Sequence, residues 1–137
     1  MKQVYPTIFT KTEEGYLVEV PDMAVLTEGK DLADAIEMAR DAIGIKGICM
    51  EDEGEELPGV SRIEDIEVSE GTFAEDGEGF VSMVDIDFTA YRRKLDNKSV
   101  RRNVTLPNWL NREAEAAGLN VSRVLQEALM QKLEVQQ

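Results

Sequence analysis

The chain has 137 residues, a length that suits one medium domain, or one small domain joined to a module too small to fold alone. Hydrophobic residues make up 42% and occur in periodic runs, which excludes a disordered chain. No apolar run approaches the roughly 18 to 20 residues that span a bilayer, and the N-terminus has no signal-peptide core, so we expect a cytoplasmic protein with no membrane partner. The absence of histidine excludes histidine general-base catalysis and histidine-ligated metal sites, and the single cysteine excludes an internal disulfide.

Charge divides the chain into two unlike parts. Residues 1–90 hold 6 Lys and Arg against 23 Asp and Glu, a net charge of −17, whereas residues 91–137 hold 9 against 5, a net charge of +4. Such an asymmetry suggests that the two parts meet different partners. The acidic part repels nucleic acid and attracts a basic protein, although solubility alone is an alternative reason for its acidity.

The chain opens with three segments that alternate between apolar and polar residues. Residues 4–11 are expected to form a strand, and Pro6 near its start favours an edge position in the sheet. Residues 16–20 alternate again after the turn residues Glu13, Glu14 and Gly15, which predicts a β-hairpin. Residues 24–27 are expected to form a third, short strand.

A helix and a fourth strand complete this half. Asp31 is a good N-cap, apolar residues follow at helical spacing, and Gly44 or Gly47 is expected to end the helix. Two acidic loops punctuated by glycine, residues 50–59 and 69–79, precede a strand over residues 80–88. The order of these elements predicts an α+β fold in which one helix covers a small sheet.

Two carboxylates on one face of the fourth strand, Asp85 and Asp87, allow two interpretations. Together with Glu19 or Asp22 they could hold Mg²⁺ for phosphodiester hydrolysis. The alternative is the solvated face of a half-buried strand, which we favour because 28 acidic residues make such pairs common. We therefore expect no catalytic residue, no metal and no cofactor, and we expect Cys49 to be a buried small residue because no histidine activates it.

The basic part begins with a polar segment, residues 91–99, that is expected to be a linker with one helical turn. In the following strand-like run, Val104 and Leu106 fall on one face, while Arg101, Asn103 and Thr105 fall on the other. Pro107 is then expected as the first residue of a helix that runs to about residue 117 and stops at Gly118.

A second helix is expected after its N-cap, Asn120, with apolar residues in one continuous stripe. One strand and two helices within residues 100–137 cannot bury such a stripe alone, and a single strand leaves both backbone edges open. We therefore expect a homodimer, or a higher even oligomer, in which two strands pair antiparallel and four helices share one core. The predicted dimer core comprises Val104, Leu106, Trp109, Leu110, Val121, Val124, Leu125 and Leu129.

A paired two-stranded ribbon fits the major groove of double-stranded DNA. Its outward residues Arg101, Asn103 and Thr105 are of types that bond guanine, adenine and thymine edges, so they are the predicted base contacts. The free backbone N–H groups at the start of the second helix favour a phosphate, as does a basic residue at the strand edge. The predicted phosphate contacts are Arg102, Asn120, Val121 and Ser122. A plain dimerisation element with solvated arginines is the alternative.

Two segments of the chain carry resemblances to known families. Residues 100–129, VRRNVTLPNWLNREAEAAGLNVSRVLQEAL, resemble a ribbon-helix-helix DNA-binding domain, with proline at the helix start and Gly-x-Asn-x-Ser between the helices. Residues 5–44 resemble the N-terminal domain of HicB antitoxins through Tyr-Pro-x-x-Phe, Gly-Tyr-x-Val, Val-Pro-Asp and Thr-x-Gly before the helix. The chain departs from that family at residues 23–25, Met-Ala-Val, where Pro-Gly-Cys is frequent.

The resemblance implies a partial RNase H-like sheet without a working catalytic set over residues 1–90, a linker over 91–99 and a ribbon-helix-helix domain over 100–137. It also implies an antitoxin that neutralises a HicA-like ribonuclease toxin and represses its own operon by binding operator DNA. The candidates for toxin contact are Glu19, Asp22 and Glu28. Two alternatives stay open: a repressor whose first domain senses a ligand, and a metal-dependent nuclease that uses Asp85 and Asp87.

Overall fold

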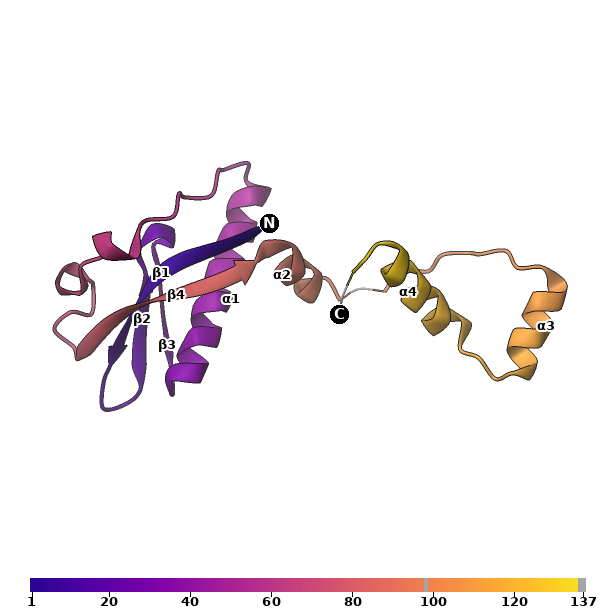
Figure 1. Cartoon of the computed structure of the whole chain (residues 1–137), viewed down its shortest axis with the longest axis horizontal. Helices are drawn as coiled ribbons and strands as arrows, with labels where there is room; N and C mark the ends of the chain where they lie inside the picture. The colour runs from indigo at the N-terminus through magenta and orange to yellow at the C-terminus, as the bar shows by residue number, and fades with distance from the viewer. Residues whose placement is uncertain (98, 136–137) are drawn as a thin grey trace. The chain divides into compact units, whose positions relative to one another are not determined.

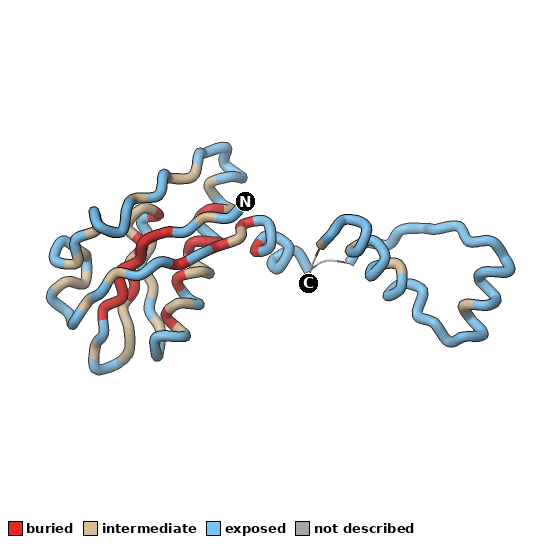
Figure 2. The backbone as a smooth tube through the Cα atoms, viewed as in Figure 1, coloured by how far each residue is buried: buried red, intermediate tan, exposed pale blue. Residues whose placement is uncertain are grey.

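The computed structural model describes residues 1–97 and 99–135 of the chain, which form two compact units, Met1–Lys98 and Ser99–Gln137 (Figure 1). Every buried residue among those described belongs to the first unit (Figure 2). The first unit therefore has a core of its own, whereas the second has none as a single copy. None of the described helices combines the length and the apolar character that a membrane crossing requires.

The first unit is built on an antiparallel sheet in the order β3-β2-β1-β4. All four strands were expected from the sequence, with bounds that differ by at most a few residues, and the mixed α+β class is confirmed. The β1–β4 ladder runs in continuous register from Lys2↔Asp87 to Lys11↔Glu78, and the shorter β1–β2 ladder runs from Ile8↔Glu19 to Lys11↔Tyr16. The strands are β1 (Lys2–Lys11), β2 (Tyr16–Val20), β3 (Val25–Gly29) and β4 (Glu78–Asp87).

The prediction that Pro6 marks an edge strand is wrong, because β1 lies between β2 and β4. The pairing of β1 with β2 starts only at Ile8, so Pro6 has β4 as its sole neighbour strand. The Arg40 side chain bonds to the carbonyl of Asp85, which therefore points away from β1. Val4 pairs with Asp85, so its backbone nitrogen also points away from β4, and the same holds for Pro6 two residues further on. Both nitrogens face the side of β1 on which β2 has not yet begun to pair. A missing N–H costs no ladder bond there.

One long helix, α1 (Leu32–Asp52), packs along one face of the sheet (Figure 1). Asp31 caps it as expected, its carboxylate accepting a hydrogen bond from the Asp34 N–H at 2.8 Å. Two expectations for this helix are wrong: it continues past Gly44 and Gly47, and Cys49 on it is exposed. The hydrophobic core of the unit consists of Tyr5, Phe9, Val18, Val20, Met23, Ala35, Ala39, Ile43, Val84, Ile86, Phe88 and Tyr91.

The two glycines inside α1 serve close packing and do not end the helix. A short helix, α2 (Phe88–Leu95), follows β4 directly and packs on α1. A Cβ at Gly44 would stand 2.7 Å from the Tyr91 ring, and one at Gly47 would overlap the Phe88 ring. Phe88 and Tyr91 are buried against these glycines. Glycine lowers the intrinsic helix propensity of α1, but it leaves the space that the two aromatic rings occupy. Residues 91–95, expected as part of a linker, thus belong to the first unit.

A long acidic segment joins α1 to β4 and contains two single turns of 3-10 helix, η2 (Ile63–Asp65) and η3 (Val68–Glu70). Both turns contact β4. A third such turn, η1 (Pro21–Met23), links β2 to β3 and ends at Ala24, which has a φ of 53°. Few residues other than glycine adopt this left-handed conformation, so the departure from the family pattern falls on a constrained turn.

The second unit contains two helices, α3 (Asn108–Ala116) and α4 (Val121–Lys132). Gly118 ends the first of them as expected, with a φ of 68° and the Leu119 N–H bonding back to the Ala114 carbonyl at 3.1 Å. Pro107 is the residue before the helix and not its first residue. Residues 100–106 are exposed and form no strand in the described single chain. A strand needs a neighbour to bond with, and no other described segment pairs with these residues.

Candidate functional site

Two of the three candidate carboxylates for toxin contact hold the acidic segment, residues 53–77, onto the sheet. Both oxygens of Asp22 accept hydrogen bonds from Ser61, at 2.7 Å from the backbone N–H and 2.6 Å from the hydroxyl. Glu19 binds Thr72 in the same way, at 2.9 and 2.8 Å. Each carboxylate thus fixes one point of a segment that has little regular structure. Their first role in this structure is to position that segment.

We expect Asp22→Ala to loosen the acidic segment around Ser61. Hydrogen bonds to charged groups contribute roughly 1.5–3 kcal/mol, so local opening should become about tenfold more frequent or more. Hydrogen exchange of residues 53–77 measures this. Asp65→Ala, an exposed carboxylate on the same segment, is the matched control and should leave exchange unchanged. Equal exchange in the two variants would show that the hydrogen bonds between Asp22 and Ser61 do not hold the segment.

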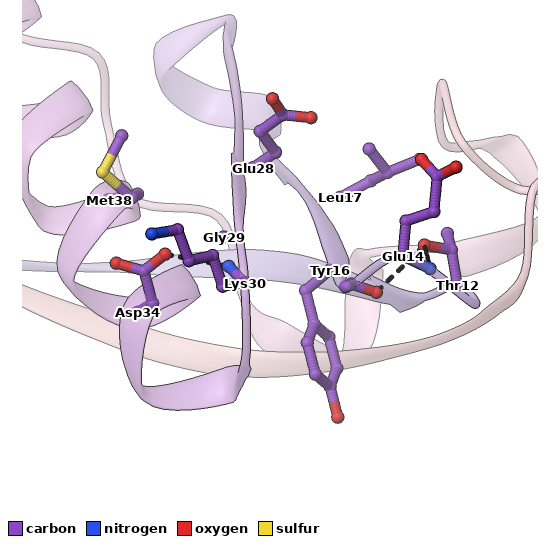
Figure 3. A pocket seen from close by; sticks show the side chains of 10 residues that line it. Thr12, Glu14, Tyr16, Leu17, Glu28, Gly29, Lys30, Asp34 and Met38 are labelled. Carbon is purple, nitrogen blue, oxygen red and sulfur yellow. Dashed lines mark hydrogen bonds between the residues drawn. The ribbon is translucent and has the colours of Figure 1, made fainter.

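The third candidate, Glu28, lies in a hollow of about 520 Å³ that is lined by the β1–β2 turn, β2, the end of β3 and α1 (Figure 3). Three carboxylates line it, Glu14 from the β1–β2 turn, Glu28 from β3 and Asp34 from α1, together with the single cation Lys30. Asp34 accepts a hydrogen bond from the Lys30 backbone N–H at 2.8 Å, whereas the structure records no bond within the described residues for the carboxylates of Glu14 and Glu28. Tyr16, Leu17 and Met38 add apolar surface.

Sequence reasoning found only Glu28 of this group. Glu14 was predicted as a turn residue, which is correct, and Asp34 lies in the first turn of the helix that Asp31 caps. No sequence signal joins them, because a hairpin turn, a strand edge and the first turn of a helix meet only in the folded unit. The hollow is therefore a product of tertiary structure.

Asp85 and Asp87, the pair considered for metal binding, have separate structural roles. Arg40 donates a hydrogen bond to the Asp85 carboxylate at 3.0 Å, and this bond lowers the pKa of that exposed carboxyl. Asp87 caps α2 by accepting from the Ala90 N–H at 3.2 Å, which lowers the pKa of its carboxyl. Within residues 1–97 and 99–135 no group of three acidic or sulfur side chains is placed to hold a metal ion.

The residues predicted to form a dimer core lie at the surface of the single second unit. Trp109 is 62% exposed, Val104 and Leu129 are each about half exposed, and Leu125 is partly covered. The remaining members, Leu106, Leu110, Val121 and Val124, are all exposed as well. So many exposed large apolar side chains are unusual for a small unit that stays monomeric.

The predicted DNA-contacting residues are all exposed. Arg101, Asn103 and Thr105 lie on the extended segment, as does Arg102. Asn120 uses its side-chain oxygen to cap α4, accepting from the Arg123 N–H at 3.2 Å. The carboxamide oxygen is thus committed to the helix, and the helix start offers an anion the backbone N–H groups of Val121 and Ser122.

One family model covers most of the chain, and one curated relative is similar over a comparable length. A family model described as "HicB_like antitoxin of bacterial toxin-antitoxin system" matches residues 5–128. A 14.9 kDa protein from the rep-hol intergenic region of Haemophilus phage HP1 is 31% identical over 108 residues, which is 78% of this chain and 75% of that protein.

Solved structures give the same answer. A chain of a toxin–antitoxin complex from Streptococcus pneumoniae superposes with a TM-score of 0.61 at 26% identity, covering 96% of this chain and 99% of that one. A chain of a HicA3 and HicB3 toxin–antitoxin complex has a TM-score of 0.50 at 27% identity, covering 62% of this chain and 99% of that one. The antitoxin HicB3 on its own has a TM-score of 0.51 at 26% identity, covering 95% and 97% of the two chains. This chain belongs to the HicB-like antitoxin family of bacterial toxin–antitoxin systems.

Proposed function

We propose that this antitoxin neutralises a HicA-like ribonuclease toxin with its first unit and represses its own operon with its second. In this proposal the protein is non-enzymatic and acts in the cytoplasm, and its first unit is a reduced RNase H-like fold. The second unit is a ribbon-helix-helix dimer on operator DNA. The observation that carries the proposal is the contrast between the units: the first has a net charge of −14 and a core of its own, whereas the second has a net charge of +1 and no buried residue among those described for the single copy.

The toxin-binding part draws on two solved relatives that are chains of toxin–antitoxin complexes. The charge of residues 1–90 gives a physical reason for the choice of partner. A net charge of −17 attracts a basic protein and raises its association rate, and it repels nucleic acid from the same surface. A toxin that binds RNA is basic because it must contact phosphates. The negative charge of the antitoxin therefore attracts such a toxin.

The DNA-binding part rests on the exposed side chains of the second unit. Its apolar residues need a partner surface, and a second copy supplies one with the same pattern. When two copies pair residues 100–106 antiparallel, the free backbone groups of each segment gain partners, and Val104 and Leu106 turn inward. Arg101, Asn103 and Thr105 then point outward from a ribbon of the width that the major groove accepts.

One experiment tests both parts. We expect the purified chain to bind the small basic protein encoded by the neighbouring reading frame and to shift a DNA fragment that carries its own promoter. Size-exclusion chromatography with light scattering measures the complex, and a gel shift measures DNA binding. A chain that binds neither partner would contradict the proposal. Binding of the basic protein alone would leave the second unit as a dimerisation element.

We expect Arg101→Ala to weaken operator binding by about 1–3 kcal/mol, because a bidentate contact to guanine contributes roughly that much discrimination. The measurement is the dissociation constant for the operator and for an unrelated DNA of the same length. Arg112→Ala, which removes an arginine from α3, serves as the control for net charge. An equal loss on both DNA sequences would identify Arg101 as a phosphate contact and not a base contact.

A further inference from the structure

We propose that the toxin adds a strand to the open edge of β3 and that its cationic side chains enter the adjoining acidic hollow. The hollow is the one lined by Glu14, Glu28 and Asp34 described above. The inference rests on the proposed function, because it names the surface with which this antitoxin holds its basic partner. It follows from the direction of backbone groups along the sheet, from the contacts at its two edges and from the distribution of charge.

The direction of the backbone groups follows from one hydrogen bond and the register. At the β1–β2 turn the Thr12 N–H donates to the Gly15 carbonyl at 2.8 Å, so the even-numbered residues of β1 direct their N–H and C=O groups towards β2. Ile8 is one of them, and its register partner Glu19 therefore points back towards β1. Glu19 also pairs with Leu26 across the β2–β3 ladder. Leu26 must then point its backbone groups away from β2.

Leu26 and Glu28 are the two residues of β3 whose N–H and C=O groups face outward, because these groups alternate along a strand. Both residues are exposed, with Leu26 at 53%. The structure records no hydrogen bond for these backbone groups within the described residues. β3 is the terminal strand on this side of the sheet. It thus offers four backbone groups to an incoming strand, which is the geometry of β-augmentation.

The opposite edge of the sheet is better protected. By the same alternation β4 directs the backbone of Val81, Met83 and Asp85 outward, as the Arg40 bond to the Asp85 carbonyl requires. That bond, at 3.0 Å, occupies the edge with a cation that also pairs with the Asp85 carboxylate. A charged side chain bound over an edge strand hinders pairing with another strand. The β4 edge is thus covered by an ion pair without net charge, whereas carboxylates outnumber the one lysine beside β3, so a basic strand is attracted to β3.

Charge also selects the occupant of the β3 edge. Two copies of this chain pairing through β3 would bring two sets of the same carboxylates together, and like charges across a ladder are destabilising. A basic strand meets instead the unbonded carboxylates of Glu14 and Glu28, which line the hollow (Figure 3). Tyr16, Leu17 and Met38 can cover the methylene stems of its lysines or arginines. The carboxylates of the hollow thus suit the charged ends of lysine or arginine, and its apolar side chains suit their stems.

Leu26→Pro tests the strand addition, because it removes an outward N–H without removing a bond of the β2–β3 ladder. The probe is the small basic protein from the neighbouring reading frame, in an inactive form. We expect binding to weaken at least about tenfold. Met83→Pro, the same change at an outward position of the other edge, should bind like the wild type. Leu26→Ala, which keeps the N–H, separates loss of the side chain from loss of the donor and should bind more tightly than Leu26→Pro.

A charge-reversal pair tests the hollow without altering the backbone. We expect Glu14→Lys with Glu28→Lys to weaken binding at least about tenfold, whereas Glu55→Lys with Glu75→Lys, the same change in net charge on the acidic segment, should weaken it far less. Equal loss in the two double variants, or wild-type affinity in Leu26→Pro, would overturn the inference. Absence of binding by the wild-type chain would instead overturn the proposed function, so the two failures are distinguishable. Thermal unfolding of each variant shows whether the fold is retained, and the double variants decide if Leu26→Pro does not fold.

Discussion

We expect Leu125→Asp to abolish dimer formation and operator binding together. In the single second unit Leu125 is only partly covered, so the substitution costs that unit little. In the proposed dimer each copy would bury an unpaired carboxylate between four helices, at roughly 3 kcal/mol or more per copy. Sedimentation velocity and a gel shift measure the two losses. Binding of the basic toxin should persist, because the proposed toxin surface lies on the first unit.

The matched control for Leu125→Asp is Gln126→Asp. It places the same charge on the next residue of α4, away from the apolar stripe, and should leave both dimer and DNA binding intact. A Leu125→Asp variant that still dimerises would refute the arrangement in which α4 lies at the centre of the dimer. Loss of DNA binding with the dimer retained would separate the two functions and place Leu125 near the DNA.

The second large effect is expected at Gly47, where Gly47→Leu should destabilise the first unit by about 3–5 kcal/mol. A Cβ at this position already overlaps the Phe88 ring, and a leucine side chain has no space to fill. α2 must then leave α1, which uncovers Phe88 and Tyr91 and removes the hydrogen bonds from Arg92 to Glu51 and Asp52. Chemical denaturation monitored by circular dichroism measures the loss.

Gly47→Ala makes this test sharper, because alanine favours a helix by about 1 kcal/mol over glycine and yet should still destabilise the unit here. Gly59→Ala is the control, since a Cβ at that position meets no atom within 4 Å. It should be neutral or slightly stabilising through the unfolded chain. Stabilisation by Gly47→Ala would show that the α1–α2 contact yields easily and contributes little.

Local patterns in the sequence predicted much of this protein. Period-two alternation located the strands, a side-chain cap at Asp31 and another at Asn120 located two helix starts, and Gly118 located a helix end. These features depend on residues close together in the chain, so the sequence alone determines them. The charge division between residues 1–90 and 91–137, and the family resemblance carried by residues 5–44, belong to the same class.

Contacts between distant residues were decided only by the tertiary structure. The sequence predicted a helix end at Gly44 or Gly47, because glycine commonly follows a helix. In the structure α1 continues past both glycines, and two aromatic rings of α2 fill the space that their side chains would take. The sequence suggested Glu19 and Asp22 only as candidate toxin contacts or metal ligands, but Thr72 and Ser61 bind them from 53 and 39 residues further along the chain. The hollow beside β3 likewise needs three separate elements. Residues 100–106 were predicted as a strand and form none in the described single chain, because a strand needs a second strand to bond with.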